Sequence, residues 1–336
     1  MNYHQITPDM TIKDLVKSGY YGTFADYFFS YMTPDHWNSK LSSYGYDKCG
    51  FVPALHRMEE LAATEENYLY HIYSEEEQLS EWDKKDAVLL HYPGPSHNRP
   101  YAIVIPGGGF NRHWGLIEGQ AIAAHLNELG YTAFVLYYRV KQEPLMPKPI
   151  EDMYQCIRFI EAHADTFHVQ AGHYMIGGFS AGATIAGEIG STNLGWATAG
   201  IPKPEMIFLG YTAISMNAFY DNYQSAPAGH PVREGIGPFL RRVGGTNFTR
   251  ESLQPYDLPE HMDKDYPPVY LTANEDDQTV PVSNTHLMDE ICTKLGIPHR
   301  TRIGMQGGHS FGLGIGLEVE GWLDEAVDFW KSLRTK

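Results

Sequence analysis

The sequence predicts an α/β fold, in which a mostly parallel, doubly wound sheet is flanked by helices. From about residue 86, short apolar segments bounded by turn residues alternate with amphipathic segments, and this alternation continues nearly to the last residue. Such alternation is typical of parallel sheets, because a helix supplies the crossover between two parallel strands. We therefore expect the sheet to be covered on both faces and its crossovers to be right-handed.

Each element has a local signal of its own. In the helix expected over residues 116–130, Ile122, Leu126 and Leu129 recur at helical spacing, and Gly130 marks the end. Strands are expected at residues 87–92, 101–105, 131–140, 173–180, 205–212, 267–275 and 299–304. The remaining helices of this region are expected at residues 149–167, 181–190, 283–296 and 319–333.

The chain is expected to have one main domain with two additions. Residues 1–85 are rich in aromatic and acidic side chains and show helix-like segments over 11–29 and 51–67. They predict a helical N-terminal extension that acts as a cap or as an interface. Residues 86–336 are expected to form the main domain. Within it, residues 212–266 form an insertion with five prolines and several aromatics, which is typical of a lid or binding loop.

Composition and charge narrow the classes of partner. The formal net charge is −16, which disfavours nucleic acid and anionic membranes, because both are negatively charged. The three cysteines are widely spaced, and no metal-ligand spacing is present, so no metal or organic cofactor is expected. The first residues lack a basic start followed by an apolar run, and no segment of about 18 apolar residues occurs. These features predict a soluble, cytoplasmic protein that acts on a small molecule.

The stretch GGFSAG at residues 177–182 contains the pattern G-x-S-x-G. It follows the apolar strand segment YMIG and opens a predicted helix, which is the context of a nucleophile elbow. A turn this tight requires small neighbours, and it leaves the amide of Ala181 free at a helix N-terminus. Ser180 is therefore the candidate nucleophile, and Ala181 is one candidate donor to an oxyanion.

A serine nucleophile needs further groups, and the sequence offers a candidate for each. The loop IPGGGF after an early strand can supply backbone N–H groups, with Gly108 and Gly109 as the candidate donors. A phosphate-binding glycine loop is the alternative, but neither GK[ST] nor GxGxxG is present there. The end of the strand at 267–275 and the residues after it offer Glu275, Asp276 and Asp277 as candidate acids, and Asp277 is taken as the acid. His309, framed by glycines, is the candidate base.

Taken together, these motifs resemble a known family. PGGGF, YYRV with the helix that begins PIEDM, GGFSAG, DDQTVP and GGHSFG resemble the α/β-hydrolase esterases, in particular the acetyl esterases and acetyl-xylan-esterase-like enzymes. These enzymes are related to the hormone-sensitive-lipase and dienelactone-hydrolase branches. The resemblance covers roughly residues 86–335. It implies an α/β-hydrolase fold, and its D-x-x-V-P pattern selects Asp277. It implies structural roles for Arg139 and Asp152.

The resemblance implies a serine esterase for short acyl groups, most simply acetyl on a sugar, an oligosaccharide or another small alcohol. Related esterases often dimerise, so a homodimer is one expected assembly. The residues interpreted as lining the substrate pocket are Phe110, Asn111, Trp114 and Phe179. A serine peptidase or amidase of the prolyl-oligopeptidase type is the alternative, although no propeller-length region precedes the hydrolase segment. A binding module without catalysis is a third hypothesis, which the complete set of candidate groups disfavours.

Overall fold

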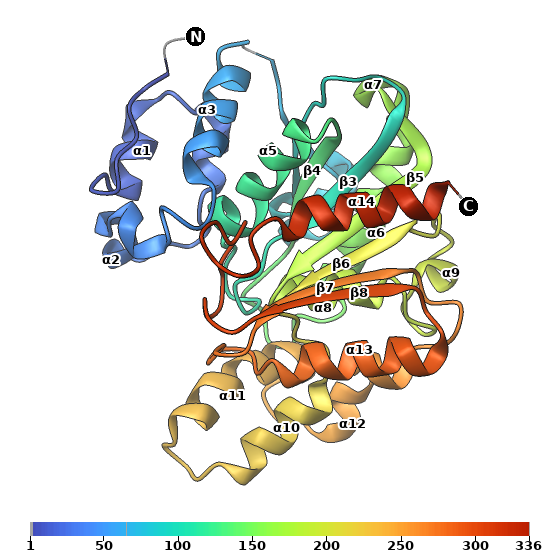
Figure 1. The fold of residues 1–336 in the computed structure, drawn as a ribbon. Coiled ribbons are helices and arrows are strands. Elements are labelled where there is room, and N and C mark those ends of the chain that lie inside the picture. Colours follow the sequence, from blue (N-terminus) through green and yellow to red (C-terminus); the bar gives the residue numbers. More distant parts are fainter. Residues whose placement is uncertain (1–2, 65, 336) are drawn as a thin grey trace.

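The computed structural model describes residues 3–64 and 66–335, which build around one eight-stranded sheet (Figure 1). The strand order is β1-β2-β4-β3-β5-β6-β7-β8. The strands are β1 (Leu69–His71), β2 (Val88–Tyr92), β3 (Arg99–Ile105), β4 (Thr132–Tyr137), β5 (Val169–Phe179), β6 (Met206–Gly210), β7 (Val269–Asn274) and β8 (His299–Gly304). Strand β2 pairs antiparallel with both β1 and β4. The remaining pairings, from β4 to β8 in the strand order, are parallel. The predicted mostly parallel sheet is confirmed.

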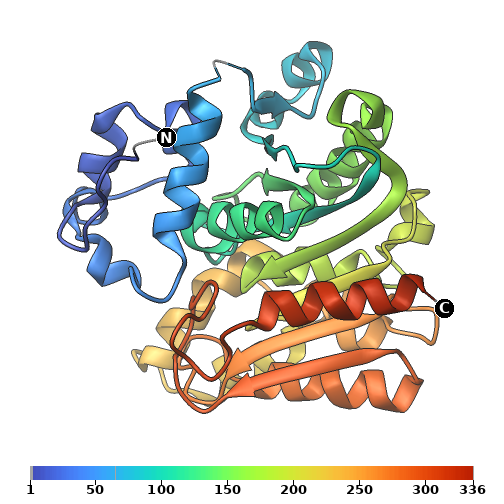
Figure 2. The ribbon, with the colours of Figure 1, turned by 45° about the horizontal axis from the view of Figure 1, so that its top comes forward.

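Helices cover both faces of this sheet (Figures 1 and 2). In the N-terminal region they are α1 (Ile12–Ser18), α2 (Pro34–Asn38), α3 (Phe51–Ala62) and α4 (Glu75–Ser80). They continue with α5 (Ala121–Glu128), α6 (Lys148–Ala162), α7 (Ala164–Phe167), α8 (Ala181–Glu188) and α9 (Trp196–Ala199). The last are α10 (Met216–Ser225), α11 (Pro231–Gly244), α12 (Arg250–Leu253), α13 (Ser283–Leu295) and α14 (Trp322–Arg334). A π-helical turn, Leu116–Gln120, precedes α5.

Two hydrophobic cores lie on opposite faces of the sheet. Successive strand residues point to opposite faces, so Leu89 belongs to the core that contains α6, α8 and α13, whereas Val88 belongs to the core that contains α5 and α14. Every residue of β2, β4, β6 and β7 is buried, which explains why these segments are apolar without alternation.

The N-terminal region contains short helices and one strand. A capping box between Thr11 and Asp14 opens α1, which ends at Ser18 because Gly19 takes a left-handed conformation with φ 75°. The expected helix over 11–29 is therefore wrong beyond residue 18, where a short 3₁₀ helix, Gly22–Tyr27, follows instead. The strand β1 was not expected, and its pairing with β2 extends the sheet into this region.

The N-terminal region also contacts loops near the carboxyl ends of the parallel strands. The N–H of Leu116 donates to the carbonyl of Phe28 at 2.7 Å, and the N–H of Ile315 donates to that of Lys48 at 2.9 Å. Burial lowers the pKa of His113 to about 3, so this side chain is neutral near pH 7. Its Nδ1 lies 2.8 Å from the Ser30 hydroxyl. These contacts hold the N-terminal region against the loops that follow β3 and β8.

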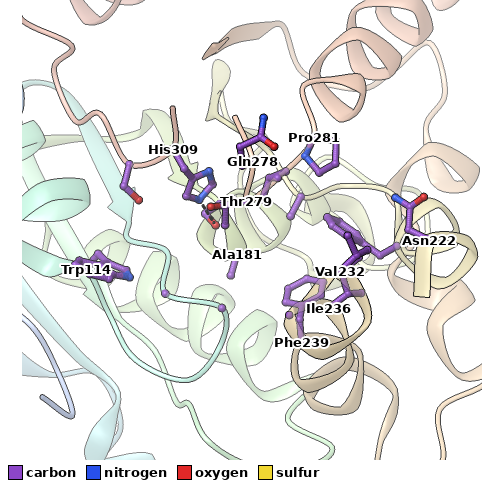
Figure 3. A pocket seen from close by; sticks show the side chains of 18 of the residues that line it. Trp114, Ala181, Asn222, Val232, Ile236, Phe239, Gln278, Thr279, Pro281 and His309 are labelled. Atoms are coloured by element: carbon purple, nitrogen blue, oxygen red, sulfur yellow. Dashed lines mark hydrogen bonds between the residues drawn. The ribbon is translucent and has the colours of Figure 1, made fainter. Parts of the chain in front are cut away.

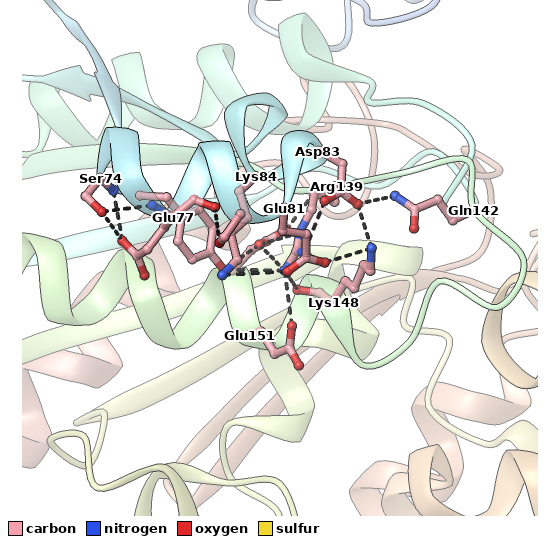
Figure 4. A network of polar contacts seen from close by, with 12 residues as sticks. Ser74, Glu77, Glu81, Asp83, Lys84, Arg139, Gln142, Lys148 and Glu151 are labelled. Atoms are coloured by element: carbon pink, nitrogen blue, oxygen red, sulfur yellow. Dashed lines mark hydrogen bonds and ion pairs between the residues drawn. The ribbon is translucent and has the colours of Figure 1, made fainter.

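A buried charge network attaches the end of the N-terminal region, between α4 and β2, to the rest of the fold (Figure 4). Arg139, only 1% exposed, donates to the fully buried Asp152 at 2.8 Å. The same guanidinium contacts Glu81 at 3.0 Å, and Lys148 contacts Asp83 at 2.7 Å. Both Glu81 and Asp83 belong to the segment that links α4 to β2, so the network ties that segment to β4 and α6. Arg139 and Asp152 thus have a structural role, in agreement with their interpretation from the sequence.

The insertion at 212–266 contains α10, α11 and α12, which lie together at the lower end of the molecule in Figure 1. Helix α11 begins at Pro231, whose missing N–H costs nothing at a helix start. Its apolar face includes Leu240 and Val243, which join the core that contains α6 and α8. Within residues 3–64 and 66–335, no helix combines the length and the apolar character that crossing a bilayer requires.

Candidate active site

Ser180 stands at the sharp turn between β5 and α8. Its backbone has φ 52° and ψ −120°, a strained conformation for a residue with a side chain. The neighbouring glycines are required by space. A Cβ on Gly178 would lie 2.2 Å from the carbonyl oxygen of Gly182, and a Cβ on Gly182 would lie 2.3 Å from that of Ile105. The G-x-S-x-G sequence therefore forms the strained strand–turn–helix expected of a nucleophile elbow.

The three residues predicted as nucleophile, base and acid come together. His309 Nε2 lies 3.0 Å from Ser180 Oγ, and His309 Nδ1 lies 2.7 Å from Asp277 Oδ2. The side chain of Asp277 is fully buried, that of His309 is 14% exposed, and Ser180 is 9% exposed. One ring nitrogen of His309 contacts the serine and the other contacts the aspartate. This arrangement can move a proton from the serine to the histidine.

The structure separates the two competing aspartates. Asp277 uses Oδ2 for His309, while its Oδ1 accepts from the N–H groups of Thr279 and Val280 at 2.8 and 3.0 Å. Asp276 instead accepts from the N–H of Gly308 at 2.8 Å. Asp276 thus holds the glycine loop that precedes His309, and only Asp277 contacts the imidazole. Glu275, the third acid of this segment, pairs with His286 at 3.1 Å.

The glycine loop after β3 lies beside the serine. The N–H of Gly107 is already engaged, because it donates to Glu118 at 2.8 Å. Gly108 and Gly109 have φ 131° and 61°, and in the described part of the chain no protein acceptor receives a hydrogen bond from either amide. Ala181, the first residue of α8, has its N–H at the helix N-terminus, where no helical carbonyl precedes it. These three amides are the available donors.

A cavity of about 680 Å³ opens over the serine (Figure 3). Trp114 lies on one side of it, and Val232, Ile236 and Phe239 of helix α11 lie on the other, with His309 between them. Gly108, Gly109, Ala181 and Ser180 also line it, together with Phe219, Asn222 and the segment from Gln278 to Pro281. The insertion therefore supplies one wall of the cavity.

Three of the four residues interpreted as pocket-lining lie elsewhere, and Trp114 alone of the four lines the cavity. Phe110 is fully buried and stacks on Phe239 with ring centroids 5.4 Å apart. Phe179 is fully buried between Phe208, Tyr211 and Trp322, since it points from the elbow into the core.

Asn111 does not line the cavity, and its side-chain oxygen accepts a hydrogen bond from Arg242 of α11 at 3.2 Å. For Asn111, Phe110 and Phe179 the sequence interpretation is therefore corrected. These residues are close in sequence to the serine or to the glycine loop. Closeness in sequence does not determine whether a side chain points into the cavity or into the core.

Two features of the cavity were missed by reasoning from sequence. Glu118 lies at the cavity, fully buried, although it had been treated only as part of a helix. Its acidic character inside the apolar stretch GLIEGQAIAA was a signal that could have found it. The apolar face of α11 was the second, and its spacing of Val232, Ile236 and Phe239 is helical. No group of three or more His, Cys, Asp or Glu side chains in the described residues is arranged to hold a metal ion.

Comparison with known proteins agrees with this fold. Residues 90–227 match the BD-FAE family model. The chain is 25% identical over 248 residues to endo-1,4-beta-xylanase B of Butyrivibrio fibrisolvens, covering 71% of this chain and 36% of that protein. It is 26% identical over 168 residues to esterase LipC of Mycobacterium tuberculosis, covering 49% of this chain and 38% of LipC. The chain spans less than half the length of the curated relatives it matches.

Solved structures share the fold. An acetyl ester-xyloside bifunctional hydrolase from Caldicellulosiruptor lactoaceticus superposes with a TM-score of 0.66 at 24% identity, covering 79% of this chain and 96% of that one. A truncated carbohydrate esterase from gut microbiota superposes with a TM-score of 0.61 at 17% identity, covering 74% and 91%. The sheet, the elbow and these similarities define the fold, and the chain has the α/β-hydrolase fold.

Proposed function

We propose that this protein is a serine esterase that hydrolyses carboxylic esters with short acyl groups, acetyl esters of a sugar or another small alcohol above all. The observation that carries the proposal is the continuous contact from Ser180 through His309 to Asp277, next to three unengaged amides. The names of two similar proteins, an endo-xylanase and an acetyl ester-xyloside hydrolase, support a carbohydrate ester as substrate.

The proposed reaction proceeds through an acyl-enzyme. Ser180 Oγ attacks the ester carbonyl carbon while its proton passes to His309 Nε2, and Asp277 holds the ring and stabilises the imidazolium. The carbonyl oxygen becomes an oxyanion, which the N–H groups of Ala181 and of Gly108 or Gly109 stabilise. The carbon–oxygen bond to the alcohol then breaks as His309 returns its proton to the leaving oxygen. Water, deprotonated by His309, attacks the acyl-enzyme and releases the acid.

The cavity supports a substrate larger than the acyl group. A volume of about 680 Å³ lies within the range of cavities that bind small molecules and exceeds what an acetyl group fills. The remaining space would take the alcohol, with Asn222, Gln278 and Thr279 available for hydrogen bonds to hydroxyl groups. Trp114 offers an aromatic surface on which a sugar ring can pack.

A series of p-nitrophenyl esters from acetyl to long acyl chains tests this proposal. We expect the acetyl ester to be hydrolysed fastest, and Ser180→Ala to retain only a trace of activity. Asp277→Asn and Asp276→Asn form a matched pair of neighbouring acids. We expect Asp277→Asn to lower kcat by roughly 10⁴-fold, as in serine hydrolases whose histidine loses its acid, and Asp276→Asn to have a much smaller effect.

Two outcomes would contradict the proposal. If Ser180→Ala hydrolyses esters as fast as the wild type, Ser180 is not the nucleophile. If the wild type cleaves none of the esters but cleaves a proline-containing chromogenic dipeptide, the amidase alternative replaces the esterase.

A further inference from the structure

Glu118 is a buried acid that the proposed reaction does not use. It lies on the π-helical turn Leu116–Gln120, is fully buried and lines the cavity that opens over Ser180. Single π turns occur often at functional sites, because the extra residue changes which side chain faces the site. A buried carboxylate is unfavourable unless hydrogen bonds compensate for the lost water, so its presence here needs a cause.

Three donors surround this carboxylate, and each belongs to a different part of the candidate active site. Glu118 Oε2 accepts from the N–H of Gly107, the first glycine of the loop after β3, at 2.8 Å. Oε1 accepts from the hydroxyl of Ser310, the residue after His309, at 2.7 Å. Oε1 also accepts from the hydroxyl of Tyr211, the residue after β6, at 3.0 Å.

Tyr211 extends the connection to the base and to the elbow. Its ring contacts the imidazole of His309 with centroids 4.6 Å apart. The residue before it, Gly210, accepts the N–H of Ser180 at 3.0 Å. One carboxylate thus connects the loop that carries the candidate oxyanion donors, the loop that carries the base, and the strand end that supports the nucleophile.

The glycine loop after β3 also packs closely against the elbow that carries Ser180. A Cβ on Gly107 would lie 2.6 Å from the carbonyl oxygen of Phe179 and 2.8 Å from both Glu118 Oε2 and the Cβ of Ser180. Gly107 is therefore clamped between the elbow and the carboxylate. A shift of Glu118 must move this glycine, and with it the amides of Gly108 and Gly109.

The pKa of Glu118 is raised overall, because burial outweighs the groups that lower it. Burial raises the pKa of this carboxyl above its ordinary value, while the nearby His309 and the three hydrogen-bond donors lower it. A carboxylate can accept all three bonds, whereas a neutral acid or an amide can satisfy them only if the hydroxyls of Ser310 or Tyr211 turn to accept a hydrogen bond in place of donating one. No lysine or arginine takes part in these hydrogen bonds.

We propose that Glu118 is a positioning residue, which fixes the loop amides of Gly108 and Gly109 and the imidazole of His309 relative to Ser180. Its carboxylate serves as the common acceptor that sets the distance between the loop after β3 and the loop after β8. This inference rests on the proposed serine mechanism. It assigns to Glu118 an effect on the rate of acyl transfer and not on the binding of the ester.

The test compares Glu118→Gln with Glu128→Gln, a nearly isosteric change at an exposed glutamate on α5. With p-nitrophenyl acetate, we expect Glu118→Gln to lower kcat by about 100-fold, the effect of misplacing reacting groups by about an ångström, and to change KM by less than about threefold. Glu128→Gln should match the wild type. A purely structural role would lower the melting temperature and the amount of active enzyme, but not kcat per site titrated with a fluorophosphonate.

Two further variants keep the test decisive if Glu118→Gln does not fold. Ser310→Ala and Tyr211→Phe each remove one donor, and we expect each to lower kcat per titrated site with little change in KM, and the double variant to lower it further. If kcat per titrated site stays within about threefold of wild type in these variants while Ser180→Ala is inactive, the positioning role is wrong and the proposed function stands. If Ser180→Ala is fully active, both are overturned.

Discussion

Glu188, the last residue of α8, makes the stability of this protein depend on pH. Its side chain is fully buried, and among the described residues neither carboxylate oxygen has a hydrogen-bond partner. Burial, with a smaller contribution from the charge of Asp257, raises the pKa of this carboxyl from 4.5 to about 8. In the folded protein Glu188 therefore keeps its proton near neutral pH, whereas in the unfolded chain it is ionised.

The sign and size of the effect follow from this difference. Below pH 4.5 both states are protonated and Glu188 costs nothing by ionisation. As the pH rises from 4.5 to about 8, the unfolded state loses its proton while the folded state keeps it, so the folded state loses stability progressively. One pKa unit corresponds to about 1.36 kcal/mol. Between pH 5 and pH 8 the loss through Glu188 is about 3.5 kcal/mol.

The Glu188→Gln variant removes this proton linkage. Its amide has its own cost of burial, but that cost does not change with pH, so the comparison rests on the slope. Urea unfolding of both proteins at several pH values between 5 and 8 should show the free energy of unfolding of the variant rising, relative to wild type, by about 3.5 kcal/mol. Glu76→Gln, at an exposed position of α4, is the control and should follow the wild type. Parallel profiles for wild type and Glu188→Gln would refute the reasoning.

Two further changes test the packing of the elbow and the buried network. Gly182→Ala places a methyl group 2.3 Å from the backbone oxygen of Ile105, so we expect ester hydrolysis to be lost and the protein to be destabilised by roughly 1–3 kcal/mol in a urea titration. Gly235→Ala, whose added methyl group meets no atom within 4 Å, should keep full stability, and equal stability of the two variants would contradict the steric argument. Arg139→Met leaves Asp152 buried without its partner and should cost roughly 3–5 kcal/mol of unfolding free energy. A loss below about 1 kcal/mol, the level of a surface pair, would show that the network is dispensable.

The order of strands and helices after residue 86 could be predicted because the sheet is buried on both faces. Burial on both faces demands apolar runs, and such runs are visible in one sequence without any knowledge of tertiary contacts. The strand β1 could not be predicted in this way. It has only three residues, two half-buried and one exposed, and its position depends on pairing with β2.

The residues of the candidate site likewise include some that the sequence could predict and some that it could not. Ser180 and His309 could be predicted because neighbouring glycines and small residues mark them, such as those that a strained turn requires. Glu118 is marked in the sequence only as an acidic residue in an apolar stretch, and its contact with Ser310, 192 positions away, depends on the fold. Likewise, the choice between Asp276 and Asp277 needed a family pattern, since both follow the same strand and only the fold decides which one meets the imidazole.

The contact between Lys48 and Ile315 has a consequence for the order of events during synthesis. The N–H of residue 315 reaches the carbonyl of residue 48, and the thiol of Cys49 lies 3.8 Å from the carbonyl oxygen of Ser310. Contacts between such distant positions form late in folding, because a long loop must close first. During synthesis, the N-terminal region is made before the segment that it contacts, because Ser310 follows Cys49 by more than 260 residues. The contact between His309 and Ser180 likewise forms only after residue 309 has been made.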